Sequence, residues 1–156
     1  MKIIQQTNIT LLTPAGKITA PVEISYDDEA NSNNKSELSL YYGGIKYTGN
    51  GTDHLSTDTF ADLQLKLPKN VKLACCMTCI HGNMCPYSND DNLLFCTKDL
   101  KIICKKDMCD LFDHTDPFRD RAVASLDYCE EFVYQSDDCY TYNDYLHQLN
   151  KKRTDI

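Results

Sequence analysis

CCMTCIHGNMCPYSNDDNLLFC, residues 75–96, is the stretch that organises this sequence. It begins a segment, Cys75 to Cys139, that holds all nine cysteines, whereas residues 1–74 contain none. This is the sharpest change of composition along the chain. We therefore expect a β-rich subdomain in residues 1–74 and a cysteine-rich, metal-binding subdomain in residues 75–156.

The cysteines of this stretch follow the pattern Cys76-x2-Cys79-x5-Cys85-x10-Cys96. A C-x2-C pair closes a tight turn that points both sulfurs at one ion, and two further thiolates complete a tetrahedron. We predict that Cys76, Cys79, Cys85 and Cys96 hold a metal ion. Zinc is the first candidate, because a structural ion supplies folding free energy to a loop-rich module. An iron-sulfur cluster fits the same ligands, and disulfides or free thiols are the third reading.

The ligand set has alternatives. Cys75-x3-Cys79 could replace the shorter C-x2-C pair, and His81 could replace one thiolate, although a surface loop histidine is the simpler reading. The remaining cysteines could form a second site of four thiolates or serve as small core residues, as a cysteine on an apolar helix face often does. They are Cys104, Cys109, Cys129 and Cys139.

Residues 76–96 resemble uncharacterised bacterial cysteine-rich proteins. The resemblance lies in the Cys-x-x-Cys pair, His81-Gly82-Asn83, Cys85-Pro86-Tyr87 and a closing Phe-Cys. It covers about the central third of the chain and implies a metal site. It brings no established activity with it.

The N-terminal part reads as mostly β. Short apolar and β-branched runs alternate with turn residues, and Gly43-Gly44 lies between two such runs in the manner of a hairpin. Helical spacing of Phe60, Leu63 and Leu67 predicts a short helix that ends at Pro68. The expected strands are Ile9–Thr13, Lys17–Tyr26, Leu38–Tyr42, Ile45–Thr48 and Asn70–Ala74.

The cysteine-rich part reads as irregular up to residue 114, with two helices near its end. Leu93–Cys96 and Ile102–Cys104 could pair as a small hairpin next to the thiolates. Phe118, Ala122, Leu126 and Cys129 recur at helical spacing and predict a helix over 118–133, which Asp116-Pro117 would start. A last helix is predicted from about Thr141 to Arg153. The expected fold class is therefore α+β.

The net charge of -7 comes mainly from the cysteine-rich part, where residues 75–150 carry six Lys and Arg against fourteen Asp and Glu. Nucleic-acid affinity depends on Lys and Arg that displace counterions from phosphates, so nucleic acid is disfavoured as a partner. A solvated acidic surface is the simplest reading, and a basic protein partner is the alternative.

The chain also lacks the sequence signals of secretion, membrane insertion and common catalysis. Gln5, Gln6 and Asn8 interrupt the apolar run that a signal peptide would need, and no membrane-spanning run is visible. We expect a cytoplasmic protein that does not bind membranes. His81-Gly82-Asn83 does not start the helix that a redox C-x2-C motif needs. The sequence favours a zinc-binding adaptor or interaction module over an iron-sulfur or thiol redox protein.

Overall fold

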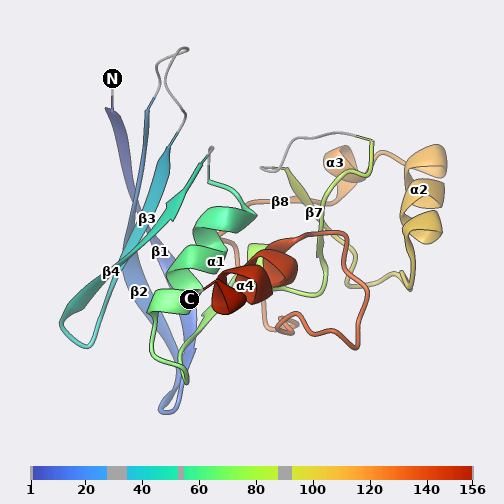
Figure 1. The fold of residues 1–156 in the computed structure, drawn as a ribbon. Helices are drawn as coiled ribbons and strands as arrows, with labels where there is room; N and C mark the ends of the chain where they lie inside the picture. The colour runs from blue at the N-terminus through green and yellow to red at the C-terminus, as the bar shows by residue number, and fades with distance from the viewer. Residues whose placement is uncertain (1, 28–34, 53–54, 88–92, 156) are drawn as a thin grey trace.

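The computed structural model describes residues 2–27, 35–52, 55–87 and 93–155. Within these residues the fold is α+β, with a five-stranded antiparallel sheet in the N-terminal half and a three-stranded antiparallel sheet in the cysteine-rich half. Figure 1 shows the large sheet on one side, helices α1 and α4 in the middle, and helices α2 and α3 at the far end. The predicted fold class is confirmed at this level.

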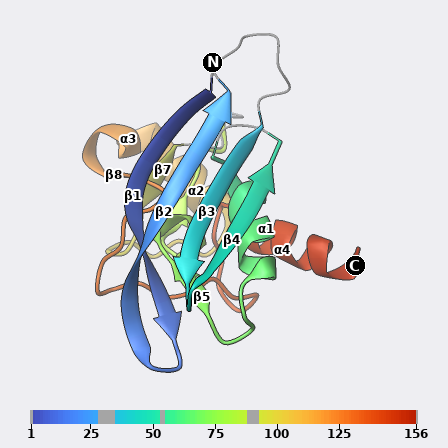
Figure 2. The same ribbon diagram turned by 90° about the vertical axis from the view of Figure 1, so that its left-hand side faces the viewer.

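The large sheet has the order β4-β3-β2-β1-β5. Its strands are β1 (Lys2–Thr13), β2 (Gly16–Asp27), β3 (Ser36–Tyr42), β4 (Ile45–Gly51) and β5 (Lys72–Ala74). Gly43 and Gly44 join β3 to β4 with φ angles of 59° and 77°, which suit glycine at both centres of a tight hairpin turn. The predicted strands are confirmed here, although β1 begins seven residues earlier than the sequence indicated. Figure 2 shows the sheet face that no helix covers.

Helix α1 (Thr57–Lys66) covers the other face of the sheet and ends just before Pro68, as predicted. Its Phe60 and Leu63 are fully buried. Strand β4 approaches the helix so closely that a Cβ on Gly49 would lie 2.5 Å from the Cβ of Leu63. A residue without a side chain is therefore needed where strand and helix meet.

Helix α4 (Tyr145–Thr154) packs against α1 and joins the C-terminal end of the chain to the same core. Tyr145 and Leu149 are buried with Phe60 and Leu63, and Lys152 pairs with Asp58 of α1 at 2.7 Å. The predicted C-terminal helix is confirmed. The two halves of the sequence thus share one hydrophobic core.

The cysteine-rich half consists of short elements. They are the 3-10 turn η1 (Cys76–Thr78), β6 (Gly82–Asn83), β7 (Leu94–Cys96), α2 (Lys105–His114), α3 (Pro117–Asp120) and β8 (Ala122–Val123). The small sheet has the order β6-β7-β8. Phe95, Phe112 and Phe118 pack edge-on or tilted with centroids 5.3 to 5.7 Å apart, so one aromatic cluster fixes α2 and α3 against β7.

Three predictions for this half are wrong. Strand β7 pairs with β6 and β8 rather than with Ile102–Cys104, which forms no strand. The region read as irregular contains helix α2. Asp107 in the first turn of this helix accepts a hydrogen bond from the Ile103 backbone N–H at 3.0 Å. The helix expected over 118–133 stops at Asp120, because the next residues pair with β7 and Arg121 accepts a backbone hydrogen bond from Cys96 at 2.9 Å.

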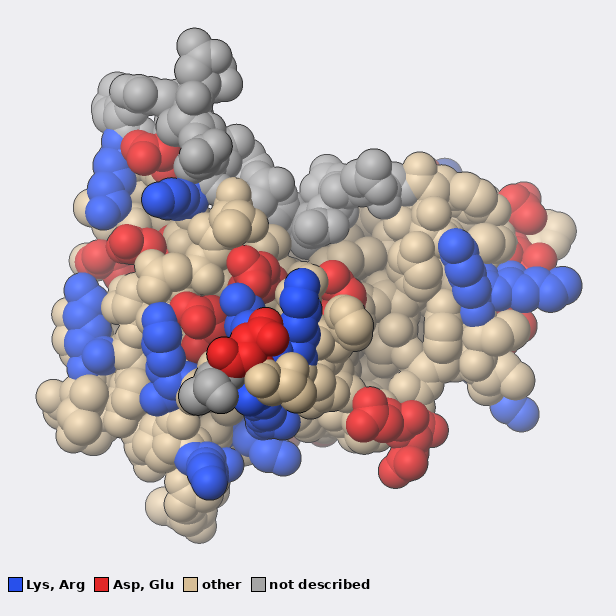
Figure 3. Space-filling model, in the orientation of Figure 1, with Lys and Arg blue, Asp and Glu red and all other residues tan. Residues whose placement is uncertain are grey.

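Charged side chains of both signs are interspersed on the face drawn in Figure 3. Lys and Arg stand beside Asp and Glu over the sheet and α4, without a broad area of one sign on that face. Among the described residues, no helix is both long and apolar enough to cross a bilayer.

Candidate metal centre

Cys76 begins the 3-10 turn η1, which follows strand β5, and Cys79 is the residue that caps the end of this turn. The turn is closed by the Cys79 N–H, which donates to the Cys76 carbonyl at 3.3 Å. The Cys79 sulfur accepts the backbone N–H of His81 at 3.5 Å. A backbone N–H that donates to a sulfur stabilises the thiolate form of that cysteine. The turn is followed by strand β6 and not by a helix.

Strand β7 brings Cys96 beside this turn, because Gly82 of β6 pairs with Cys96. The pairing requires a very close approach, since a Cβ on Gly82 would lie 1.9 Å from the Cys76 carbonyl oxygen. Arg121 also donates from Nη1 to the Cys96 carbonyl at 3.2 Å. Gly82 thus allows β7 with Cys96 to approach the turn that carries Cys76 and Cys79.

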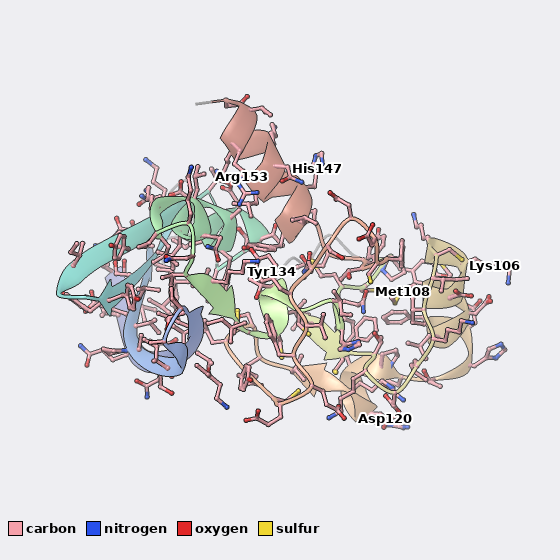
Figure 4. The ribbon with its side chains drawn as sticks, turned by 90° about the horizontal axis from the view of Figure 1, so that it is seen from below. Lys106, Met108, Asp120, Tyr134, His147 and Arg153 are labelled. Atoms are coloured by element: carbon pink, nitrogen blue, oxygen red, sulfur yellow. The ribbon has the colours of Figure 1, made fainter. Side chains whose placement is uncertain are left out.

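Residues 125–135 run along the opposite side of η1. Backbone carbonyls of Ser125 and Asp127 accept the N–H groups of Met77 and Cys76 at 3.1 and 2.8 Å. Further along, Tyr134 forms a β-bridge with Cys79, and Tyr134 marks this crossing in Figure 4. Between these two anchors lies Cys129.

A cavity of about 20 Å³ lies where these segments meet. That volume suits one particle of the size of a water molecule. Its lining includes four cysteines from three segments: Cys76, Cys79, Cys96 and Cys129. His81, Asp127 and Phe132 are also part of its wall.

Among the described residues, no three or more His, Cys, Asp or Glu side chains already stand in a metal-holding arrangement. The four cysteines therefore share a cavity without forming a coordination sphere. Thiol side chains can rotate about χ1 between staggered positions, and ion binding at this site requires such a rotation.

The electrostatics of the cavity disfavour negative charge in the absence of a cation. Burial, together with the smaller effect of the neighbouring thiols Cys75 and Cys79, raises the pKa of Cys76 to about 12. Burial also raises the pKa of Cys79, against the backbone hydrogen bonds that lower it. Burial lowers the pKa of His81, so its neutral form is favoured. An ion that coordinates thiolates would offset this cost.

Three of the four predicted ligands line the cavity, and Cys85 is not among the described residues that do. Cys129 occupies the remaining place. The helical spacing of Cys129 from Phe118 and Leu126 predicted a place on a helix face, and that helix does not form. Backbone contacts of residues 125–134 with Cys76, Met77 and Cys79 bring Cys129 to the cavity. These contacts join positions about 50 residues apart, so the sequence pattern did not indicate them.

Amide side chains fix the loops around the cavity. Asn83 donates to Thr97 at 2.9 Å and accepts from the Tyr142 backbone at 2.7 Å. Gln135 and Asn143 both donate to the Met77 carbonyl, at 3.1 and 2.8 Å. Among the described residues, no buried side-chain nitrogen or oxygen lacks a hydrogen-bond partner. The site is therefore held by side-chain bonds as much as by its short strands.

Comparison with known protein families and with curated proteins finds no match to this chain.

Proposed function

We propose that this protein is a zinc-binding module in which Cys76, Cys79, Cys96 and Cys129 hold one structural ion. The single observation that carries the proposal is the common cavity that these four side chains line. The sequence alone favoured Cys85 as the fourth ligand, and the geometry favours Cys129 in its place.

The size of the cavity favours zinc over an iron-sulfur cluster. A volume of about 20 Å³ admits one ion but not several iron and sulfide atoms with their ligands. A cluster would need the surrounding loops to open. An iron-sulfur or thiol redox protein thus remains the alternative function, with less support from the geometry.

A structural role follows from the donor set. Four thiolates close the coordination sphere of zinc and leave no position for a substrate or an activated water. We therefore assign the protein to the adaptor or interaction class, in which the ion stabilises the fold and a protein partner is the ligand. The uncovered sheet face in Figure 2 offers a surface for such contacts.

The test is metal analysis of protein that is purified with reductant and without chelator. We expect colourless protein with bound zinc, and replacement of zinc by Co²⁺ should give the intense visible bands of tetrahedral thiolate coordination. Brown protein that contains iron and absorbs near about 400 nm would favour the cluster instead. Protein free of both metals would overturn the proposal.

Ligand identity is tested by paired serine variants. Cys129→Ser should lower the zinc affinity of this site strongly, as Cys79→Ser should, because each removes one thiolate. Cys75→Ala is the matched control, since Cys75 is fully buried in the core and does not line the cavity. Full zinc content in Cys129→Ser would exclude it as a ligand.

A further inference from the structure

The sheet face that no helix covers in Figure 2 carries an open pocket of about 410 Å³. Three neighbouring strands, β1, β2 and β3, form its wall. Its lining includes Gln6, Asn8, Pro21, Glu23 and Tyr41. A volume of this size is typical of pockets that bind small molecules.

The strand register explains why polar side chains gather in this pocket. Gln6 pairs with Glu23 and Asn8 pairs with Pro21 in the antiparallel ladder of β1 and β2. Val22, between Pro21 and Glu23, is buried in the hydrophobic core. Because successive side chains of a strand point to opposite faces, the two residues beside Val22 and their partners on β1 face away from that core.

The pocket lies where the pairing of β2 with β3 stops. The ladder of these strands ends at the pair of Val22 and Leu40. The next residue of β2 is Pro21, which has no N–H to donate to a further rung. Tyr41 follows the buried Leu40 and is 51% exposed. The end of the ladder therefore has an accessible aromatic ring at its side.

The polar groups of the pocket are not engaged by the protein itself. Within the part of the chain that the structure describes, the side chains of Gln6, Asn8 and Glu23 make no hydrogen bond or ion pair. The Tyr41 ring has the Lys46 ammonium 5.9 Å from its centroid. A lone ammonium covers at most one face of a ring, which leaves ring surface for a ligand.

These side chains match the surface of a sugar. A sugar ring has hydroxyl groups, which both donate and accept hydrogen bonds, and an apolar face of C–H groups. The amides of Gln6 and Asn8 donate and accept, the Glu23 carboxylate accepts, and an aromatic ring packs against an apolar face. We propose that this pocket binds a neutral sugar ring, with Tyr41 against its C–H face and the amides and carboxylate on its hydroxyls.

The charge of the pocket favours a neutral polar ligand over other classes. Among the described residues that line it, Glu23 carries the only charge, so a phosphate or carboxylate ligand would be repelled. An apolar ligand would take the amides and the carboxylate out of water without hydrogen-bond partners. A sugar avoids both costs.

The pocket is also open at the surface, because Gln6, Asn8 and Tyr41 are exposed. A chain of sugars can therefore extend beyond the ring that the pocket holds, and we expect an oligosaccharide as the ligand. This inference goes beyond the proposed function, because neither the zinc ion nor a protein partner takes part in it.

The test is an NMR titration of the full chain, labelled with ¹⁵N and purified with reductant and without chelator. Cellohexaose, maltohexaose and N-acetylchitohexaose are each added up to about 10 mM, which detects dissociation constants in the millimolar range. We expect at least one of them to shift the side-chain NH₂ signals of Gln6 and Asn8 and the backbone signal of Tyr41. No shift at these positions with any of the three sugars overturns the inference, as do shifts confined to other parts of the chain.

Substitution of the aromatic ring provides a second readout. Tyr41→Ala should weaken sugar binding about five- to ten-fold, whereas Tyr41→Phe should keep it, because packing against the C–H face uses the ring and not the hydroxyl. Tyr87→Ala is the matched control, since Tyr87 is 63% exposed in the cysteine-rich half and should not affect binding. Unchanged affinity in Tyr41→Ala overturns the inference.

The outcomes for sugar and metal are separate. Zinc-bound protein whose Gln6 and Asn8 signals do not respond to any of the sugars overturns this inference and leaves the proposed function intact. Protein that binds a sugar at these residues but contains no zinc supports this inference and overturns the proposed function. The titration of the unaltered chain needs no variant, so it decides the question even where a variant misfolds.

Discussion

The two halves of this molecule are held together by different means. Strands β1 and β2 pair over twelve residues each, and their ladder continues into β3 and β4. In the cysteine-rich half the strands have two or three residues, and amide side chains such as Asn83 and Asn143 bond the loops instead. One half rests on repeated backbone pairing, whereas the other depends on individual contacts between distant positions.

The difference explains where a stabilising ion would act. A long ladder with one buried face is a cooperative unit by itself. Strands of two or three residues are marginal alone, so their arrangement needs cross-links. Under the proposed function, thiolates that bind one ion would supply such links in the part of the chain where the sheet is smallest.

The largest effect should come from the core that both halves share. Phe60→Ala removes a fully buried ring of α1 from the core that also contains sheet residues and Tyr145 of α4, and truncation of a buried Phe costs about 3–5 kcal/mol. We expect both halves to lose stability together in urea unfolding followed by circular dichroism and by hydrogen exchange.

Phe112→Ala is the matched control for Phe60→Ala. Phe112 of α2 is half-buried in the aromatic cluster with Phe95, so its loss should raise exchange in α2 and leave β1 to β4 protected. Equal loss of protection across the whole chain in both variants would contradict two differently held regions.

The next effect should be confined to the cysteine-rich half. Gly82→Ala places a Cβ 1.9 Å from the Cys76 carbonyl, and backbone cannot yield as a side chain can. We expect a loss of about 3 kcal/mol, at the upper end for overpacking, with weaker zinc binding at the proposed site of Cys76, Cys79, Cys96 and Cys129. Titration with zinc would measure the change in affinity, and hydrogen exchange would measure the loss of stability. Normal affinity in a folded Gly82→Ala variant would show that Cys76 and Cys96 need not approach each other.

The contrast between local pairing and contacts of distant positions also decides how far the sequence could predict the fold. Runs such as Leu38–Tyr42, the turn Gly43-Gly44 and the spacing of Phe60 and Leu63 are local signals, and the structure follows them. Residues 118–133 also carry a local helical signal, but pairing with β7 and backbone hydrogen bonds to η1 override it. Long-range pairing has no local pattern, so the place of Cys129 beside Cys79 could not be predicted.

A smaller loss is expected where one amide connects several loops. Asn83→Ala removes the acceptor of the Tyr142 N–H and the donor to Thr97, and a buried group left without its partner costs about 2 kcal/mol. Urea unfolding should show this loss, with exchange rising first near Tyr142 and Thr97. Asn150→Ala, at an exposed position of α4, should change little. Similar results for both variants would mean that the ladder alone stabilises the chain.

The smallest effect concerns an exposed ion pair that supports Cys96. Arg121 donates to both carboxylate oxygens of Asp99 as well as to the Cys96 carbonyl, and the bond to Arg121 lowers the pKa of Asp99 from 3.8 to about 2. Because the folded pKa is the lower one, the pair stabilises the fold above pH 3.8, and this contribution is lost as the pH falls toward about 2. The urea midpoints of wild type and Asp99→Asn should therefore differ slightly at neutral pH and low salt, and converge near pH 2. A difference that persists at that pH, or that high salt leaves unchanged, would show that Asp99 acts through packing rather than charge, because an exposed pair is screened by ions.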